Sequence, residues 1–107
     1  MEIELLYIDG CPHYKRLLDQ LPGLLKCAGV AALVVSVCVE TDEDAQRERF
    51  LGSPTIRVNG RDVDSGAVHR SDYGLKCRIY HTPSGPSGLP CDTWLLEALT
   101  EGQREES

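Results

Sequence analysis

The sequence predicts a small α/β domain in which a mixed, four-stranded sheet is flanked by helices, in the order βαβαββα. Its 107 residues are enough for one buried core and too few for two. An early strand-helix-strand pattern places two strands in parallel with a right-handed crossover, and a later strand pair adds an antiparallel hairpin. We expect residues 1–102 to form a single domain and residues 103–107 a polar tail.

The first quarter of the chain predicts a buried strand followed by a helix. Residues 3–8 are mostly apolar strand formers, and an Asp-Gly turn at residues 9–10 closes them. Pro12 suits the first turn of a helix, because its φ is already helical and its missing N–H is not needed there. Leucines then recur at helical spacing. A Pro-Gly pair at residues 22–23 interrupts them, so we expect a kink or a break.

The middle of the chain predicts a central strand, a short helix and a hairpin. Residues 32–39 are a continuous apolar run, which is typical of a strand covered on both faces. Thr41 and the acidic residues after it cap a helix that extends to about Phe50. Residues 53–60 then form a strand that begins next to Pro54 and ends in an Asn-Gly turn.

The last part of the chain predicts less regular structure before a closing helix. Residues 61–63 return as an edge strand, and residues 64–74 read as a loop. Residues 75–80 read as extended, and the turn-forming residues of 82–90 as irregular. Cys91 opens the final helix, after which the polar tail frays.

Composition narrows the classes of partner. Eleven Lys and Arg against 17 Asp and Glu give a net charge of −6, which repels nucleic acid and anionic membranes. The 41% hydrophobic and 26% charged residues are typical of a soluble domain. We expect neither a nucleic-acid nor a membrane partner, and the oligomeric state stays open.

Five cysteines are many for a chain of this length. The segment after Met1 resembles a strand rather than a signal peptide, so we expect a cytoplasmic protein whose cysteines are reduced. No Cys-x-x-Cys or His-x-x-x-His pair is present, so the sequence supports no structural zinc site, and we expect no bound cofactor. The cysteines are Cys11, Cys27, Cys38, Cys77 and Cys91.

Cys11 is the candidate reactive residue. A cysteine at a helix N-terminus lies where free N–H groups and the helix dipole favour thiolate over thiol. His13 adds to this effect when it is protonated, or is a solvated residue of the first turn. Tyr14 could donate its hydroxyl to the sulfur or pack over it. The alternative for Cys11 itself is a small buried residue at a strand end.

Residues 11–14, Cys-Pro-His-Tyr, resemble the Cys-x-x-Cys motif of the thioredoxin-like fold, and match the Cys-Pro-His-Cys of bacterial periplasmic disulfide oxidants in three of four positions. That family also places a cis-proline beside the reactive thiol, and Pro54 stands at the matching point of the chain. The resemblance covers residues 1–63 and the final helix. It implies a thioredoxin-like fold with Cys11 as nucleophile and cis-Pro54 beside it.

A narrower resemblance combines residues 9–12, 50–56 and 77–80. Together they are similar to small bacterial thioredoxin-like proteins, some of which are labelled as related to alkylmercury lyases. This similarity singles out Cys77 beside Cys11. It implies that two thiolates could hold a soft metal ion such as mercury.

Tyr14 replaces the second cysteine of the thioredoxin motif, and this changes the expected mechanism. In a dithiol enzyme the second cysteine resolves the mixed disulfide that the first one forms. Cys27 lies about 24 Å along an unbroken helix and cannot do so. Cys38 falls inside the predicted central strand, where we expect it to be a core residue. Cys77 and Cys91 remain as possible partners of Cys11.

Three functions remain open. The first is a thiol-disulfide oxidoreductase that acts through Cys11 on a thiol or disulfide substrate, either a protein or a small molecule. The second is a mercury-binding or organomercurial-lyase-like protein that uses Cys11 and Cys77 as metal ligands, with Asp9 as the nearest acid. The third is a redox-inactive interaction module.

Overall fold

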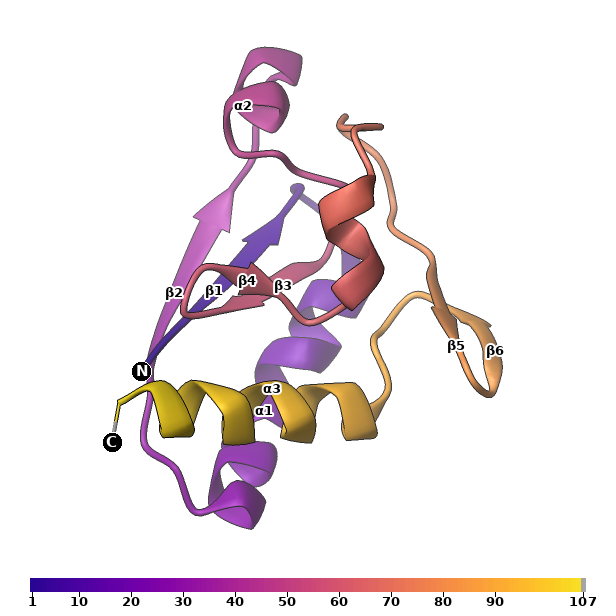
Figure 1. Cartoon of the computed structure of the whole chain (residues 1–107). Coiled ribbons are helices and arrows are strands. Elements are labelled where there is room, and N and C mark those ends of the chain that lie inside the picture. The colour runs from indigo at the N-terminus through magenta and orange to yellow at the C-terminus, as the bar shows by residue number, and fades with distance from the viewer. Residues whose placement is uncertain (107) are drawn as a thin grey trace.

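A four-stranded mixed sheet organises the chain, as predicted. The computed structural model describes residues 1–106. The sheet consists of β1 (Glu2–Tyr7), β2 (Leu33–Cys38), β3 (Thr55–Val58) and β4 (Arg61–Asp62), in the spatial order β2-β1-β3-β4 (Figure 1). β1 runs parallel to β2 and antiparallel to β3, and β3 pairs antiparallel with β4. The central strand is therefore β1.

Helices cover both faces of the sheet. α1 (Pro12–Ala28) and α3 (Asp92–Glu105) pack against each other and bury one face, whereas α2 (Asp42–Arg47) lies at the opposite end of the molecule (Figure 1). α3 continues through Glu105, so the helix extends past Gly102, where the predicted polar tail begins. No helix among the described residues is both long enough and apolar enough to cross a bilayer.

The alternation of β1 builds two separate cores. Ile3 and Leu5 point towards α1 and α3, and Leu6 points towards α2 on the other face. On the first face, the fully packed set is Ile3, Leu5, Leu17, Leu21, Leu24, Ile56, Val58, Leu95 and Leu99. On the second face, it is Leu6, Val39, Ala45 and Phe50.

α1 is one continuous helix, so of the two alternatives expected at Pro22 the break is wrong, and the kink stays a prediction. Proline removes one backbone hydrogen bond from a helix interior, which favours a break. Here Leu17, Leu21 and Leu24 are buried on one face of the helix, on both sides of the proline. Their packing spans Pro22 and maintains the helical path. Gly29 ends the helix in the left-handed conformation, with φ 68°.

β2 is an edge strand rather than the predicted central strand. It pairs only with β1, and Leu33 is 64% exposed. Cys38 is exposed as well, so its expected place in the core is wrong. The residue that is buried is its neighbour Val39, which packs against α2. A continuous apolar run is typical of a doubly covered strand, but among residues 1–106 no strand pairs with the outer edge of β2.

The segment between β4 and α3 has more structure than predicted. The Asn-Gly turn between β3 and β4 is confirmed, with φ 50° at Asn59 and 83° at Gly60. A 3-10 helix, η1 (Ser65–His69), follows. The region expected to be irregular contains a short hairpin, β5 (Tyr80–Thr82) with β6 (Gly85–Ser87).

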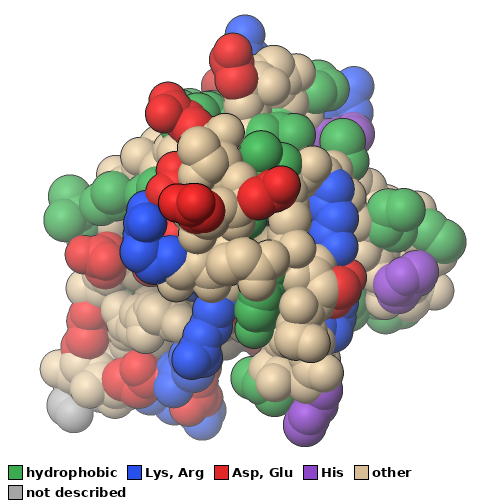
Figure 2. All heavy atoms as spheres, turned by 90° about the horizontal axis from the view of Figure 1, so that it is seen from above, with side chains coloured by type: hydrophobic (Ala, Val, Ile, Leu, Met, Phe, Trp, Pro, Cys, Tyr) green, Lys and Arg blue, Asp and Glu red, His purple; other side chains and the backbone are tan. Residues whose placement is uncertain are grey.

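The surface mixes charges of both signs with scattered apolar groups. Seen from above, acidic and basic side chains alternate over the face, with hydrophobic patches between them (Figure 2). The two ends of the chain lie close together (Figure 1), where the Met1 ammonium pairs with Glu106.

Candidate functional site

Cys11 stands immediately before α1, where the sequence predicts it. Gly10 turns the chain after β1 with φ 80°, a conformation that favours glycine. The Cys11 N–H donates to the carbonyl oxygen of Ile8 over 3.3 Å, and Pro12 is the first helical residue. The Cys11 side chain makes no hydrogen bond that caps α1 within residues 1–106. The residue is only 7% exposed, so a reagent can reach the sulfur from a narrow range of directions.

The segment before β3 is attached to the same end of β1. The Ile8 N–H donates to the Ser53 hydroxyl over 3.1 Å. The peptide bond between Ser53 and Pro54 is cis, which confirms that prediction. Because Cys11 follows Ile8 by one short turn, Cys11 and the Pro54 segment lie at the same end of the sheet.

Cys77 lies next to this segment through its backbone. Ser53 and Cys77 form a parallel β-bridge. The Ser53 N–H donates to the Lys76 carbonyl over 2.8 Å, and the Arg78 N–H donates to the Ser53 carbonyl over 3.0 Å. Both Cys11 and Cys77 are free thiols, and Cys77 is exposed. Ser53 is thus bridged to Cys77 through the backbone and hydrogen-bonded to Ile8, which lies three residues before Cys11.

Tyr14 is held by the sheet. Its hydroxyl donates to the Ser36 hydroxyl over 2.8 Å, and its ring stacks on Tyr7 with centroids 3.8 Å apart. Burial, followed by the neighbouring Tyr14 and Cys38, raises the pKa of Tyr7 above its ordinary value. The Tyr14 hydroxyl therefore donates to Ser36 of β2 rather than to the Cys11 sulfur, and the Tyr14 ring packs on Tyr7 of β1.

His13 faces the segment that leads into α3. A Cβ added at Gly88 would lie 2.6 Å from its ring, so the imidazole rests directly on that backbone. The Nδ1 atom of His13 is buried and has no hydrogen-bond partner among the described residues. The ring thus covers Gly88, and its Nδ1 atom is enclosed without a hydrogen bond from the described residues.

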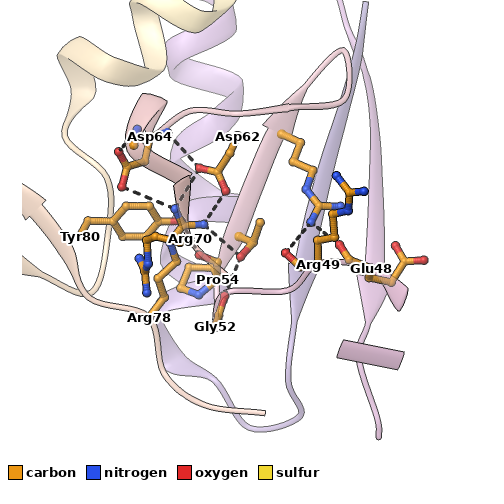
Figure 3. A network of polar contacts seen from close by, with 12 residues as sticks. Glu48, Arg49, Gly52, Pro54, Asp62, Asp64, Arg70, Arg78 and Tyr80 are labelled. Carbon is orange, nitrogen blue, oxygen red and sulfur yellow. Dashed lines mark hydrogen bonds and ion pairs between the residues drawn. The ribbon is translucent and has the colours of Figure 1, made fainter. Parts of the chain in front are cut away.

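A buried arginine holds the Pro54 segment from below (Figure 3). The Arg78 side chain is fully buried and donates to both carboxylate oxygens of Asp62, over 2.6 and 2.9 Å. It also donates to Thr55 over 3.2 Å, and its guanidinium lies 4.3 Å from the Tyr80 ring centroid. The Tyr80 hydroxyl in turn donates to the Pro54 carbonyl over 2.5 Å. The network fixes both sides of this segment.

Burial and ion pairing oppose each other at Arg78. Burial is the largest single effect and acts to lower its pKa, but the hydrogen bonds to Asp62 and the charges of Tyr80, Asp62 and Asp64 together outweigh it, so the net shift is upward. Asp64 adds a second carboxylate at 3.7 Å. Burial also raises the pKa of the Tyr80 phenol far above its usual range, which keeps the hydroxyl protonated and able to donate.

The network around Arg78 is what sequence reasoning missed. Arg78 and Tyr80 belong to the segment that accompanies Cys77 in the resemblance, yet a single arginine there reads as a surface residue. The available signal is the close spacing of Asp62 and Asp64, which supplies the negative charge that a buried guanidinium requires.

The remaining cysteines lie outside this arrangement. Cys27 and Cys38 are exposed, and Cys91 is half-buried at the start of α3. No group of three or more His, Cys, Asp or Glu side chains among the described residues could hold a metal ion. This absence concerns sites with three or more ligands and does not bear on a two-thiolate site formed by Cys11 and Cys77.

Comparisons with known proteins assign no family. No family model, curated protein sequence or solved structure matches the chain significantly.

Proposed function

We propose that this protein has a thioredoxin-like fold and is a thiol-disulfide oxidoreductase that uses Cys11 as its nucleophile. The observation that carries the proposal is the position of Cys11 at the start of α1, at the sheet edge where Ile8 is hydrogen-bonded to Ser53. The strand order β2-β1-β3-β4, with α1 connecting the parallel pair, supports the fold assignment. The free N–H groups of the first helical turn favour a thiolate at this position.

The first chemical step is an exchange. The Cys11 thiolate attacks one sulfur of a substrate disulfide, a new S–S bond forms to Cys11, and the other substrate sulfur leaves as a thiolate. Because Tyr14 occupies the place of a resolving cysteine, a second thiol must then attack this mixed disulfide. A small-molecule thiolate attacks the substrate sulfur of the mixed disulfide, which forms a new disulfide with the substrate and releases the Cys11 thiolate. Cys77 would instead attack the Cys11 sulfur, which forms a Cys11–Cys77 disulfide and releases the substrate thiolate.

In this proposal, the Pro54 segment limits the approach of a substrate to Cys11. The Arg78 network holds Pro54 through its carbonyl, and a rigid segment next to the thiol limits the directions from which a disulfide can approach. Because Cys11 is only 7% exposed, its burial also limits the directions from which a disulfide can approach.

Alkylation kinetics test the proposal. Iodoacetamide should modify Cys11 at pH 6 faster than it modifies a model thiol such as N-acetylcysteine, with the site assigned by mass spectrometry. Cys11→Ser should abolish the exchange of a mixed disulfide such as β-hydroxyethyl disulfide with glutathione. Cys27→Ser is the matched control, because Cys27 is exposed near the far end of α1. Reactivity of Cys11 no greater than that of the model thiol would refute the proposal.

A second candidate function is soft-metal binding by Cys11 and Cys77. The observation in its favour is the β-bridge that brings Cys77 to Ser53. Calorimetry with mercuric ion distinguishes the two: a tight site lost in both Cys11→Ser and Cys77→Ser supports metal binding, whereas weak binding of the wild-type protein contradicts it.

A further inference from the structure

A cleft lies away from Cys11. It has a volume of about 680 Å³ and lies between the β3-β4 hairpin, the end of α2, η1 and one turn of α3. Neither Cys11, Pro54 nor Cys77 lines it. A volume of this size is typical of sites for small molecules.

Much of the cleft wall is apolar. Val68 lines it and is 80% exposed, so its side chain is open to a ligand. The apolar and aromatic residues of the wall are Leu51, Val58, Val63, Ala67, Val68, Tyr73 and Ala98. Such a surface favours a ligand with an apolar body.

Four arginines also line the cleft, and two of them are paired. Arg47 pairs with Asp44, and Arg61 pairs with Glu105. The other two are Arg49 and Arg57, and neither forms an ion pair with a carboxylate in the described part of the chain.

Arg57 is oriented without being neutralised. Its guanidinium donates to the carbonyl oxygens of Glu48 and Arg49, the latter over 3.1 Å. Backbone carbonyls fix the direction of the group but leave its full charge. Arg49 is exposed, so its own guanidinium is accessible at the same side of the cleft.

Most carboxylates that line the cleft form ion pairs with cations outside it. Asp62 and Asp64 point towards the buried Arg78 (Figure 3). Glu101 lies 3.9 Å from Arg104. Of the charged groups that line the cleft, Arg49, Arg57 and Glu48 are then left outside these ion pairs. The whole lining holds four arginines and four carboxylates, so Arg49 and Arg57 supply a local positive charge rather than a net one.

We propose that this cleft binds a small organic anion with an apolar body, whose carboxylate or phosphate meets Arg49 and Arg57. A guanidinium matches both kinds of anion with two parallel hydrogen bonds. The apolar body packs against the wall near Val68. The site is independent of the thiol chemistry at Cys11.

The test uses phenyl phosphate and benzoate as probes, with benzyl alcohol as the neutral analogue. Binding is followed by amide shifts in ¹⁵N-¹H NMR spectra of the full chain, which also report whether each variant is folded. We expect the anions, and not the alcohol, to shift the amides of residues 47–49 and 57–68. The stronger of the two anions identifies the headgroup.

Variants assign the contacts. Arg49→Gln should weaken binding of the better anion roughly tenfold, because a charged hydrogen bond is lost. Val68→Glu, at an exposed position, should weaken it as well, because it adds a negative charge to the cleft lining. Arg16→Gln, an exposed arginine on α1, should leave binding unchanged. Equal binding of benzyl alcohol, no shifts in the cleft at millimolar anion, or wild-type affinity in both cleft variants would overturn the proposal.

Discussion

Asp62→Asn should destabilise the protein far more than an ordinary surface substitution. The change removes the charge that both Nη atoms of Arg78 meet over 2.6 and 2.9 Å, while the Arg78 side chain stays fully buried. Breaking a buried ion pair from one side costs about 3–5 kcal/mol. Asp64, at 3.7 Å, compensates in part, so we expect about 3 kcal/mol. That is a large share of the roughly 5–15 kcal/mol that stabilises a domain of this size.

Urea unfolding followed by far-UV circular dichroism measures this loss. The slope for a small protein is about 1–3 kcal/mol/M, so the midpoint should fall by about 1–3 M. Asp72→Asn is the matched control, since it removes the same charge from an exposed carboxylate that pairs with Arg70 and Lys76. Surface pairs contribute about 0–1 kcal/mol. A loss for Asp62→Asn no greater than that for Asp72→Asn would refute the reasoning.

The double variant Asp62→Asn with Arg78→Met sharpens the test. If the loss of stability in Asp62→Asn arises from an unpaired buried charge, the double variant should be no less stable than Asp62→Asn alone. Additive losses would show instead that packing of the arginine stem against Tyr80 dominates.

Three further changes probe the same region. Gly52→Ala should lower the unfolding free energy by more than Gly10→Ala, as measured in urea, because a Cβ at Gly52 would lie 2.9 Å from Arg78 whereas Gly10 has open space. Burial raises the pKa of Tyr80 in the folded protein above its value of 10 in the unfolded chain. The contribution of Tyr80 to the unfolding free energy should therefore be fully present below pH 10 and be lost above it, and Tyr80→Phe should remove that loss. For Asp72, hydrogen bonds from Arg70 and then Lys76 lower the pKa, so its contribution is present at neutral pH and lost in acid. A smaller acid sensitivity of the thermal midpoint in Asp72→Asn checks this.

Local chemistry allowed the site around Cys11 to be predicted. The Asp-Gly turn and the proline after Cys11 each act within a few residues, so the start of α1 followed from the sequence. The cis bond at Pro54 was expected from the resemblance rather than from local chemistry. The four-stranded mixed sheet followed from the order of apolar runs.

Long-range pairing was what the sequence could not convey. The apolar run of β2 has the same composition whether a further strand covers its outer edge or not, and so the exposure of Cys38 was unpredictable. Arg78 is buried only because Asp62 and Tyr80, from other strands, surround it. No periodicity in the segment itself records such partners.

The bridge between Ser53 and Cys77 also sets the order in which parts of the molecule can open. The Ser53 and Arg78 amides are hydrogen-bonded only across this bridge, so they become available to solvent when residues 76–80 detach. Detachment also uncovers the buried Arg78 and Tyr80, which makes the event cooperative rather than a gradual fraying. Amide hydrogen exchange should therefore report matching opening free energies for Ser53 and Arg78, lower than those of the β1 amides paired with β2. The segment thus acts as a separate unfolding unit, and its detachment leaves the β1-β2 pair intact.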